Sequence, residues 1–374
     1  MELHGFCNDD YAAVAAAFND NFEHGLEVGA SVAVTVDGEP VVDMWAGNAD
    51  PRGTAWERDT IINVYSTTKT MASVCMLMLA DRGLLDFDAP VARYWPEFGQ
   101  NGKEGVLVRH VMSHTAGVSA FDPPITVEAL YDRETIVKGL AAQAPWWEPG
   151  TASGYHAMTQ GYIQGEILRR IDGRTMGTFF REEVAGPLGA DFHIGLPASE
   201  DGRVAELIPP VVDLANQEFD PESIAGRTLL SCIIDATEPR TREWRGAEIP
   251  AAGGTGNARS VARVHSALAC GGTVDGVRLM GPETVERVLT QQIDGKDLVL
   301  ELDVRFGIGF GLWLDNWVMS PNPRHFFWGG YGGSIALVDL DARISIAYVM
   351  NRMDSELTGD PRGKKIVRAV YEGK

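Results

Sequence analysis

The chain has 374 residues, of which 45% are hydrophobic, and it carries a formal net charge of −20 at pH 7 with a pI near 4.8. This length and composition predict one large folded domain or two closely packed domains, and they exclude an extensively disordered chain. The excess of acidic residues opposes binding to nucleic-acid phosphates and anionic lipids, because such binding depends on Lys and Arg. We therefore expect a partner that is a small molecule, and neither a nucleic acid nor a membrane.

Signals for export and for metal binding are missing from the sequence. The first residues, MELHGFCNDDY, contain neither the basic start nor the apolar run of a secretory signal, and no window of about 20 apolar residues could span a bilayer. The four cysteines lie far apart without CxxC spacing, and the eight histidines include no HExxH motif. We expect a cytoplasmic protein without a disulfide framework, a metal or a cofactor.

The N-terminal part of the chain predicts a helix, a β-hairpin and a buried helix. Residues 10–23 place apolar side chains along one helical face. Two β-rich runs, 30–36 and 41–45, are joined by Asp37-Gly38, which is a strong hairpin signal. Residues 66–80 are almost unbroken in Met, Ala, Val, Cys and Leu, so we predict a helix that is buried on most sides.

The rest of the chain predicts an inserted helical region followed by strands. Helical patterns alternate with Pro and Gly between residues 86 and 250, which predicts a mainly helical domain over 86–250. The patterns after it predict a helix at 260–270, β-strands at 307–314, 334–340 and 344–351, and a C-terminal helix at 362–371. Strands at both chain ends predict an α+β fold with one antiparallel sheet, built by an α/β domain of residues 1–85 and 251–374. We expect the active site to lie between the two domains.

The stretch YSTTKT at residues 65–70 places Ser66 and Lys69 on one face at the start of the buried helix. A serine hydroxyl becomes a strong nucleophile when a base removes its proton, and a lysine can be that base if burial disfavours its charged form. The helix N-terminus would also stabilise a developing oxyanion. Taken alone, however, the pair is better explained as a helix cap followed by a solvated lysine. The chain contains neither a GxxxxGK[ST] phosphate loop nor a GxSxG nucleophile turn.

Further segments accompany this pair in a fixed order along the chain. They are TIINVYSTTKTMASVCMLMLADRGLLDFDAP at 60–90, VRHVMSHTAG at 108–117, WEPGTASGY at 147–155, PAAGGTGNARSVAR at 250–263, and the closing segment 327–351 with its Gly-x-Gly-Gly-Ser. These five segments resemble, in the same order, conserved elements of the serine β-lactamase and penicillin-binding-protein superfamily, beginning with its nucleophile helix. The resemblance covers about residues 10–355 and implies a β-lactamase-like fold.

Within that superfamily the chain is most similar to the family VIII carboxylesterases, which share the class C β-lactamase fold. The similarity rests on VDMWAG at 42–47, YHAMTQG at 155–161 and WGG at 328–330. Ala157 stands where a β-lactamase has an Asn that would bind a substrate amide, and Trp328 stands where it has a Lys that helps to hold the β-lactam carboxylate. A site without that cation should prefer uncharged, apolar acyl or alcohol groups.

The resemblance implies three catalytic residues: Ser66 as the nucleophile, with Lys69 and Tyr155 moving the proton. A phenol normally titrates at about 10, but we expect Lys69 to favour the Tyr155 anion, so that either residue could be the general base or the two could titrate as a pair. The resemblance also implies an oxyanion hole made of the backbone NH groups of Ser66 and Tyr331. The competing interpretations are a buried tyrosine that closes the Pro-Gly turn and, for the glycines around residue 330, a bulged edge strand.

Several residues near these motifs are candidates for contact with the substrate. They are Trp328, Gly329, Gly330, His156 and Phe121. For each aromatic side chain, packing in the core explains its presence at least as well. We expect His110 and His114 to fasten their loop through hydrogen bonds.

These observations predict a serine carboxylesterase that hydrolyses small, relatively apolar carboxylic esters through an acyl-enzyme. The alternative on the same scaffold is an amide hydrolase: a β-lactamase, a D-amino-acid peptidase or a linear-amide hydrolase. A more distant alternative is a non-catalytic protein that uses the fold for binding or assembly, which the presence of Ser66, Lys69 and Tyr155 disfavours. The resemblance also allows a homodimer.

Overall fold

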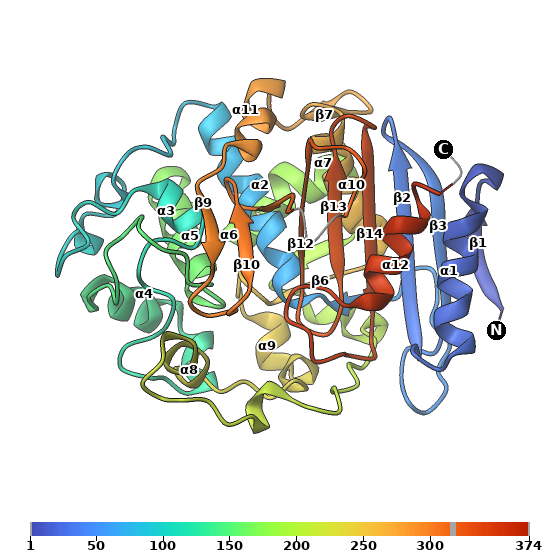
Figure 1. Cartoon of the computed structure of the whole chain (residues 1–374), viewed down its shortest axis with the longest axis horizontal. Helices are drawn as coiled ribbons and strands as arrows, with labels where there is room; N and C mark the ends of the chain where they lie inside the picture. Colours follow the sequence, from blue (N-terminus) through green and yellow to red (C-terminus); the bar gives the residue numbers. More distant parts are fainter. Residues whose placement is uncertain (1, 315–318, 373–374) are drawn as a thin grey trace.

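One nine-stranded antiparallel sheet joins the two ends of the chain (Figure 1). In the computed structural model, which describes residues 2–314 and 319–372, the strand order is β1-β3-β2-β14-β13-β12-β11-β10-β9. The strands are β1 Leu3–Cys7, β2 Gly29–Val36, β3 Glu39–Gly47, β9 Ile293–Lys296, β10 Asp303–Phe306, β11 Gly311–Leu312, β12 His325–Gly329, β13 Ile335–Asp339 and β14 Ile344–Met350. Strand β2 pairs with β14 from Ala30 opposite Met350 to Val36 opposite Ile344. This pairing confirms the predicted sheet built from both chain ends.

Helices cover both faces of the sheet around β2 and β14. Helix α10 (Ala258–Ala269) packs against these two strands, while α12 (Pro361–Ala369) and α1 (Ala12–Glu23) lie together over the other face (Figure 1). Strands that are covered on both faces have continuous apolar sequences rather than alternating ones. The sequence ISIAYVM of β14 is accordingly buried along its whole length.

The segment between the two halves of the sheet folds mainly into helices. They are α3 Val108–Met112, α4 Arg133–Ala142, α5 Thr159–Asp172, α6 Met176–Phe180, α7 Gly186–Leu188, α8 Ile224–Leu230 and α9 Arg242–Gly246. A small sheet of β4 (Ile62–Asn63), β6 (Gly254–Gly256) and β5 (Phe192–Ile194) ties this segment to the chain on either side of it. The domain boundaries at 85/86 and 250/251 stay a prediction.

Helix α2 (Thr68–Asp81) runs between the sheet and the helical segment (Figure 1). Its residues from Thr68 to Leu79 are all buried, as their apolar sequence predicts. It follows a 3-10 turn, Tyr65–Thr67, so the α-helix begins two residues later than expected. Beyond α10 the chain adds a short hairpin of β7 (Thr273–Val274) and β8 (Val277–Arg278), and then α11 (Pro282–Glu286).

Two parts of the large sheet differ from the sequence prediction. The predicted strand 307–314 is wrong, because the chain turns there: the Gly307 NH donates to the Phe310 carbonyl at 3.0 Å, and only Gly311–Leu312 is extended as β11. Strands β10 and β12 lie outside the predicted strands, and β1 and β9 have no counterpart in the prediction either. The sequences of β1 and β9, LHGFC and IDGK, each contain a glycine and lack a regular apolar alternation.

Candidate active site

Ser66 lies in the 3-10 turn that leads directly into α2. The residue before it, Tyr65, has a left-handed backbone with φ of +43°, which is strained for a bulky side chain. Two hydrogen bonds hold this conformation: the Tyr65 NH donates to Asn63 Oδ1 at 3.1 Å, and the Tyr65 hydroxyl donates to the Ala236 carbonyl at 2.9 Å. These contacts fix the direction of Ser66, which is 8% exposed.

Lys69 is buried one helical turn after Ser66. Its Nζ lies 3.0 Å from Ser66 Oγ and donates to the carbonyls of Ala157 at 2.7 Å and Ala251 at 3.0 Å. Burial lowers the pKa of Lys69 well below its ordinary value of 10.5, and no carboxylate in the described part of the chain offsets this effect. A neutral amine uses its two N–H groups on the two carbonyls, which leaves its lone pair facing the Ser66 hydroxyl. The solvated-lysine interpretation is therefore wrong, and Lys69 has the geometry of a general base.

The Tyr155 phenol lies beside this pair and is also buried. Lys69 Nζ is 4.8 Å from the centroid of the Tyr155 ring, and Trp328 Nε1 donates to the phenol oxygen at 3.1 Å. Burial raises the pKa of Tyr155 above its ordinary value of 10, and this outweighs the hydrogen bonds with Ser66 and Trp328, which act in the opposite direction. This shift is opposite to the expectation that Lys69 favours the Tyr155 anion, because burial disfavours charge on both groups. A raised pKa favours the protonated phenol, which suits Tyr155 to act as an acid.

Trp328 supports Tyr155 through packing and a hydrogen bond. Its indole packs with Tyr155, Val299, Val304 and Phe306 in one buried cluster, and its ring centroid lies 5.4 Å from that of Tyr155. Trp328 is not among the residues that line the apolar pocket next to Ser66. The sequence predicted that Trp328 contacts the substrate. In the structure its indole NH instead donates to the Tyr155 phenol oxygen.

The end of strand β12 closely approaches the backbone of Ser66. A Cβ atom added at Gly330 would lie 3.1 Å from the Ser66 backbone nitrogen and would collide with the Val64 carbonyl, so only glycine fits here. The Gly330 NH donates to the Ser334 carbonyl at 2.8 Å. By contrast, none of the hydrogen bonds found within residues 2–314 and 319–372 uses the NH of Tyr331. The Tyr331 NH is thus available, as the predicted oxyanion hole requires.

Asp297 anchors Tyr155 and was not identified from the sequence. This fully buried residue accepts three backbone NH groups on Oδ1, from Tyr155 at 3.0 Å and from Val299 and Leu300 at 2.9 Å each. Its other oxygen, Oδ2, is buried and has no hydrogen-bond partner among the residues that the structure describes. The carboxylate ties the loop after β9 to the backbone of Tyr155. No local pattern around Asp297 indicates a contact with a residue so distant in the chain.

The three histidines near the site have structural contacts. His156 is fully buried, with Nδ1 2.6 Å from the Gly154 carbonyl and Nε2 accepting the Val118 NH at 3.3 Å, and burial lowers its pKa to about 4. Its predicted contact with the substrate is therefore wrong for this pocket, because both ring nitrogens face the backbone. His114 Nδ1 accepts the His156 NH at 3.0 Å, and His110 Nδ1 accepts the Leu107 NH at 3.2 Å. These bonds confirm that His110 and His114 fasten their loop.

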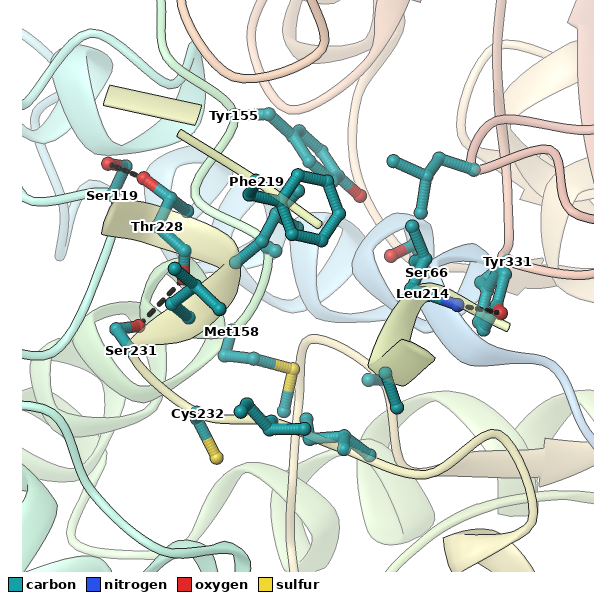
Figure 2. A pocket seen from close by; sticks show the side chains of 18 of the residues that line it. Ser66, Ser119, Tyr155, Met158, Leu214, Phe219, Thr228, Ser231, Cys232 and Tyr331 are labelled. Atoms are coloured by element: carbon teal, nitrogen blue, oxygen red, sulfur yellow. Dashed lines mark hydrogen bonds between the residues drawn. The ribbon is translucent and has the colours of Figure 1, made fainter. Parts of the chain in front are cut away.

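Ser66 opens onto an apolar pocket with about 910 Å³ of atom-free space, including its open mouth. Figure 2 shows Ser66 and Tyr331 on one side of this pocket, with Thr228 and Ser231 on the other. Its described lining comprises Tyr65, Ser66, Ser119, Phe121, Tyr155, Ala157, Met158, Leu214, Ala215, Gln217, Phe219, Thr228, Leu229, Leu230, Ser231, Cys232, Ile233, Ile234, Ala252, Tyr331 and Leu357. This lining includes Phe121, as predicted, but neither Gly329 nor Gly330, and it contains no Asp, Glu, Lys or Arg. The pocket is therefore suited to an uncharged, apolar group.

Metal-binding clusters and membrane-spanning helices are both missing from residues 2–314 and 319–372. No group of three or more His, Cys, Asp and Glu side chains there is arranged to hold a metal ion. None of the helices in residues 2–314 and 319–372 combines the length and hydrophobicity that a bilayer crossing requires. All four cysteines are free thiols.

Comparison with known proteins relates this geometry to a family. A family model described as Beta-lactamase matches residues 18–370. The esterase/beta-lactamase LipL of Mycobacterium tuberculosis is 36% identical over 94% of this chain and 84% of its own length. Among solved structures, a family VIII carboxylesterase is 41% identical with a TM-score of 0.93, and a penicillin-binding protein homolog from Caulobacter crescentus is 40% identical with a TM-score of 0.92. Each of these two alignments covers 99% of this chain and 99% of the chain in the solved structure.

Proposed function

The chain belongs to the beta-lactamase family and is a carboxylic ester hydrolase within it, and we propose that it hydrolyses small, apolar esters through an acyl-enzyme on Ser66. One observation carries this proposal: the buried Lys69 amine has carbonyls on two sides and Ser66 Oγ on the third, beside a pocket whose described lining contains no charged residue. A neutral amine in that position can take the serine proton.

In the acylation step, Ser66 Oγ attacks the ester carbonyl carbon while its proton passes to Lys69 Nζ. The carbonyl oxygen becomes an oxyanion, and the NH groups of Ser66 and Tyr331 stabilise it; one such donor contributes about 3 kcal/mol in other acyl-transfer enzymes. The bond to the alcohol oxygen then breaks, and the Tyr155 phenol gives its proton to that oxygen. Lys69 returns its proton to Tyr155, so both groups end the step as they began.

In the deacylation step, a water molecule takes the place of the alcohol. Its proton passes to Lys69 as its oxygen attacks the acyl carbon, and the same two NH groups hold the second oxyanion. The bond to Ser66 Oγ breaks, and the proton held by Lys69 returns to the serine. The Trp328 indole NH stabilises the Tyr155 oxygen whenever that oxygen lacks its proton.

We assign the apolar pocket to the acyl chain, because the acyl group stays bonded to Ser66 between the two steps whereas the alcohol leaves after the first. Ala157 favours esters over amides, since its carbonyl holds Lys69 and its methyl group offers no hydrogen bond to a substrate amide. Amide or β-lactam hydrolysis is the second candidate on this scaffold. Nitrocefin assayed beside p-nitrophenyl butyrate separates the two, and faster turnover of nitrocefin would reverse their order.

The Ser66→Ala variant tests the proposed nucleophile. Hydrolysis of p-nitrophenyl butyrate should fall to the background rate, and a fluorophosphonate probe should label the wild type at Ser66 but not the variant. Ser73→Ala, which removes a buried hydroxyl on the same helix, is the matched control. Turnover that survives Ser66→Ala would overturn the proposal. Failure to label the folded wild type would favour the non-catalytic binding or assembly protein.

We also propose a cytoplasmic location. Free thiols at all four cysteines are typical of a reducing compartment. A homodimer stays a prediction, which light scattering of the purified protein would check.

A further inference from the structure

One wall of the apolar pocket is a segment with little regular structure, residues 209–222, which contains the short 3-10 helix Leu214–Asn216. The wall residues that line the pocket are Leu214, Ala215, Gln217 and Phe219. Just before them, Val211 and Val212 point into solvent, with exposed fractions of 100% and 53%. Apart from the buried Pro210, apolar packing therefore does little to hold the start of this wall.

Asp213, which is 8% exposed, holds the wall instead. Its Oδ1 accepts the Tyr331 hydroxyl at 3.2 Å and the Ala215 NH at 3.1 Å, and its Oδ2 accepts the Ala236 NH at 3.1 Å. The Tyr331 hydroxyl in turn accepts the Leu214 NH at 3.1 Å (Figure 2). The Asp213 carboxylate and the Tyr331 hydroxyl thus form a clamp, the Asp213–Tyr331 clamp, that joins the wall to Tyr331.

The rest of Tyr331 belongs to the reacting end of the pocket. Its ring packs edge-on against the ring of Tyr65, with centroids 5.4 Å apart, and Tyr65 directly precedes Ser66. Its backbone NH is one of the two donors proposed for the oxyanion. A shift of the wall at Leu214 therefore acts on the residue whose backbone would hold the oxyanion.

We propose that the Asp213–Tyr331 clamp couples filling of the pocket to the oxyanion hole. Esters whose acyl chains reach Leu214 and Phe219 then react faster than acetyl esters, rather than only binding more tightly. A long acyl chain packs against the wall and holds it in place. The clamp then holds the Tyr331 NH in its position for the oxyanion. Binding energy from contacts remote from the ester carbonyl thereby stabilises the transition state. This inference rests on the proposed function. In it, Asp213 and the Tyr331 hydroxyl are positioning groups for the Tyr331 backbone NH.

The test compares kcat and KM for p-nitrophenyl acetate and hexanoate in the wild type, Tyr331→Phe and Asp213→Ala. Tyr331→Phe removes the hydroxyl and keeps the ring and the backbone NH. In both variants the ratio of kcat for hexanoate to kcat for acetate should fall about tenfold, the size of effect expected from losing one hydrogen-bonded tie. The double variant should lose no more than the stronger single variant, because both act through one clamp. Tyr94→Phe, which removes a hydroxyl that accepts the Asp86 NH outside the pocket, is the control.

An equal fall in kcat for both esters would overturn the proposal, because the clamp would then serve the oxyanion hole alone. A higher KM for hexanoate with an unchanged ratio of kcat values would also overturn it, because the wall would then only bind. Hydrogen exchange gives a readout apart from turnover: the amides of residues 209–222 should exchange faster in both variants. If the exchange rates of these amides are the same in the variants as in the wild type, the proposed clamp is wrong but the proposed function stands. If the wild type hydrolyses neither ester, the proposed function is wrong, and the coupling with it.

Discussion

The two sides of the pocket are built in different ways. On the reacting side, Lys69 makes three hydrogen bonds, Tyr155 is fastened by Trp328 and Asp297, and all of these residues are buried. The wall of residues 209–222, by contrast, contains one short helical turn and is fastened through Asp213. The difference teaches that the proposed chemistry rests on a rigid frame, while the wall that would contact the acyl chain has few contacts of its own and is joined to that frame through Tyr331.

Replacing Lys69 tests the proposed general base on the rigid side of the pocket. Lys69→Met keeps the length of the side chain but removes the base, so kcat/KM for p-nitrophenyl butyrate should fall about 10⁴-fold. Lys138→Met, at an exposed position, is the control and should retain wild-type activity. A Lys69→Met variant within tenfold of the wild type would show that another group removes the serine proton.

Removing the Tyr155 hydroxyl tests the proton donor. Tyr155→Phe keeps the ring in place and should lower kcat about 10³-fold, because the alcohol must then leave without a proton from the phenol. The loss should shrink for p-nitrophenyl esters relative to alkyl esters, since p-nitrophenolate leaves readily without protonation. Equal losses in both ester series would argue against a role as acid.

The lowered pKa of Lys69 predicts a pH dependence of stability. Between that pKa and 10.5 the unfolded chain binds a proton on Lys69 that the folded chain does not, so wild-type stability gains from rising pH. Lys69→Met lacks this contribution. The free energy of unfolding of Lys69→Met minus that of the wild type should therefore decrease from pH 7 to pH 10 in urea titrations. A difference that is the same at both pH values would mean that Lys69 stays charged in the folded protein.

The hydrogen bond from Trp328 to Tyr155 should have a smaller effect. Trp328→Phe keeps an aromatic ring in the cluster but removes the indole NH, and kcat should fall about tenfold with KM nearly unchanged. Trp147→Phe removes an indole NH that binds the Ala152 carbonyl instead, and it serves as the matched control. A rise in KM as the main effect would restore the sequence-based expectation that Trp328 contacts the substrate.

The smallest effect is expected on the loosely held side. Phe219→Ala removes apolar surface from the wall, so kcat/KM for the hexanoate ester should fall about fivefold while that for the acetate ester changes little. Leu84→Ala, which truncates an exposed apolar side chain outside the pocket, is the control. A uniform loss for both esters would indicate that the wall is as rigid as the catalytic side.

Local sequence patterns were sufficient for most of the fold. The apolar run of α2, the Asp37-Gly38 hairpin and the buried strand β14 follow from composition and turn chemistry, and all three are confirmed. The prediction of one strand over 307–314 is wrong because a turn at Gly309, with φ of +82°, divides it. The short strands β1 and β9 depend on their neighbours for pairing and carry little signal of their own.

Sequence motifs predicted which catalytic candidates lie together. They did not predict the properties of the site that depend on contacts between distant parts of the chain. The structure brings Ser66, Lys69 and Tyr155 together, as the ordered segments imply. The protonation of Lys69 and Tyr155 depends on burial by residues far along the chain, which no local pattern reveals. The same applies to Asp297, which meets Tyr155 only through the folding of the loop after β9.

The pairing of β2 with β14 sets the order in which the enzyme becomes active during synthesis. Ser66 and Lys69 leave the ribosome long before β12, which brings Gly330 to the backbone of Ser66. Contacts between segments so far apart form slowly, and the sheet cannot close until β14 has been made. A nascent or truncated chain thus carries Ser66 without the Tyr331 NH proposed to hold the oxyanion, and we expect it to be inert toward esters until its last strands are in place.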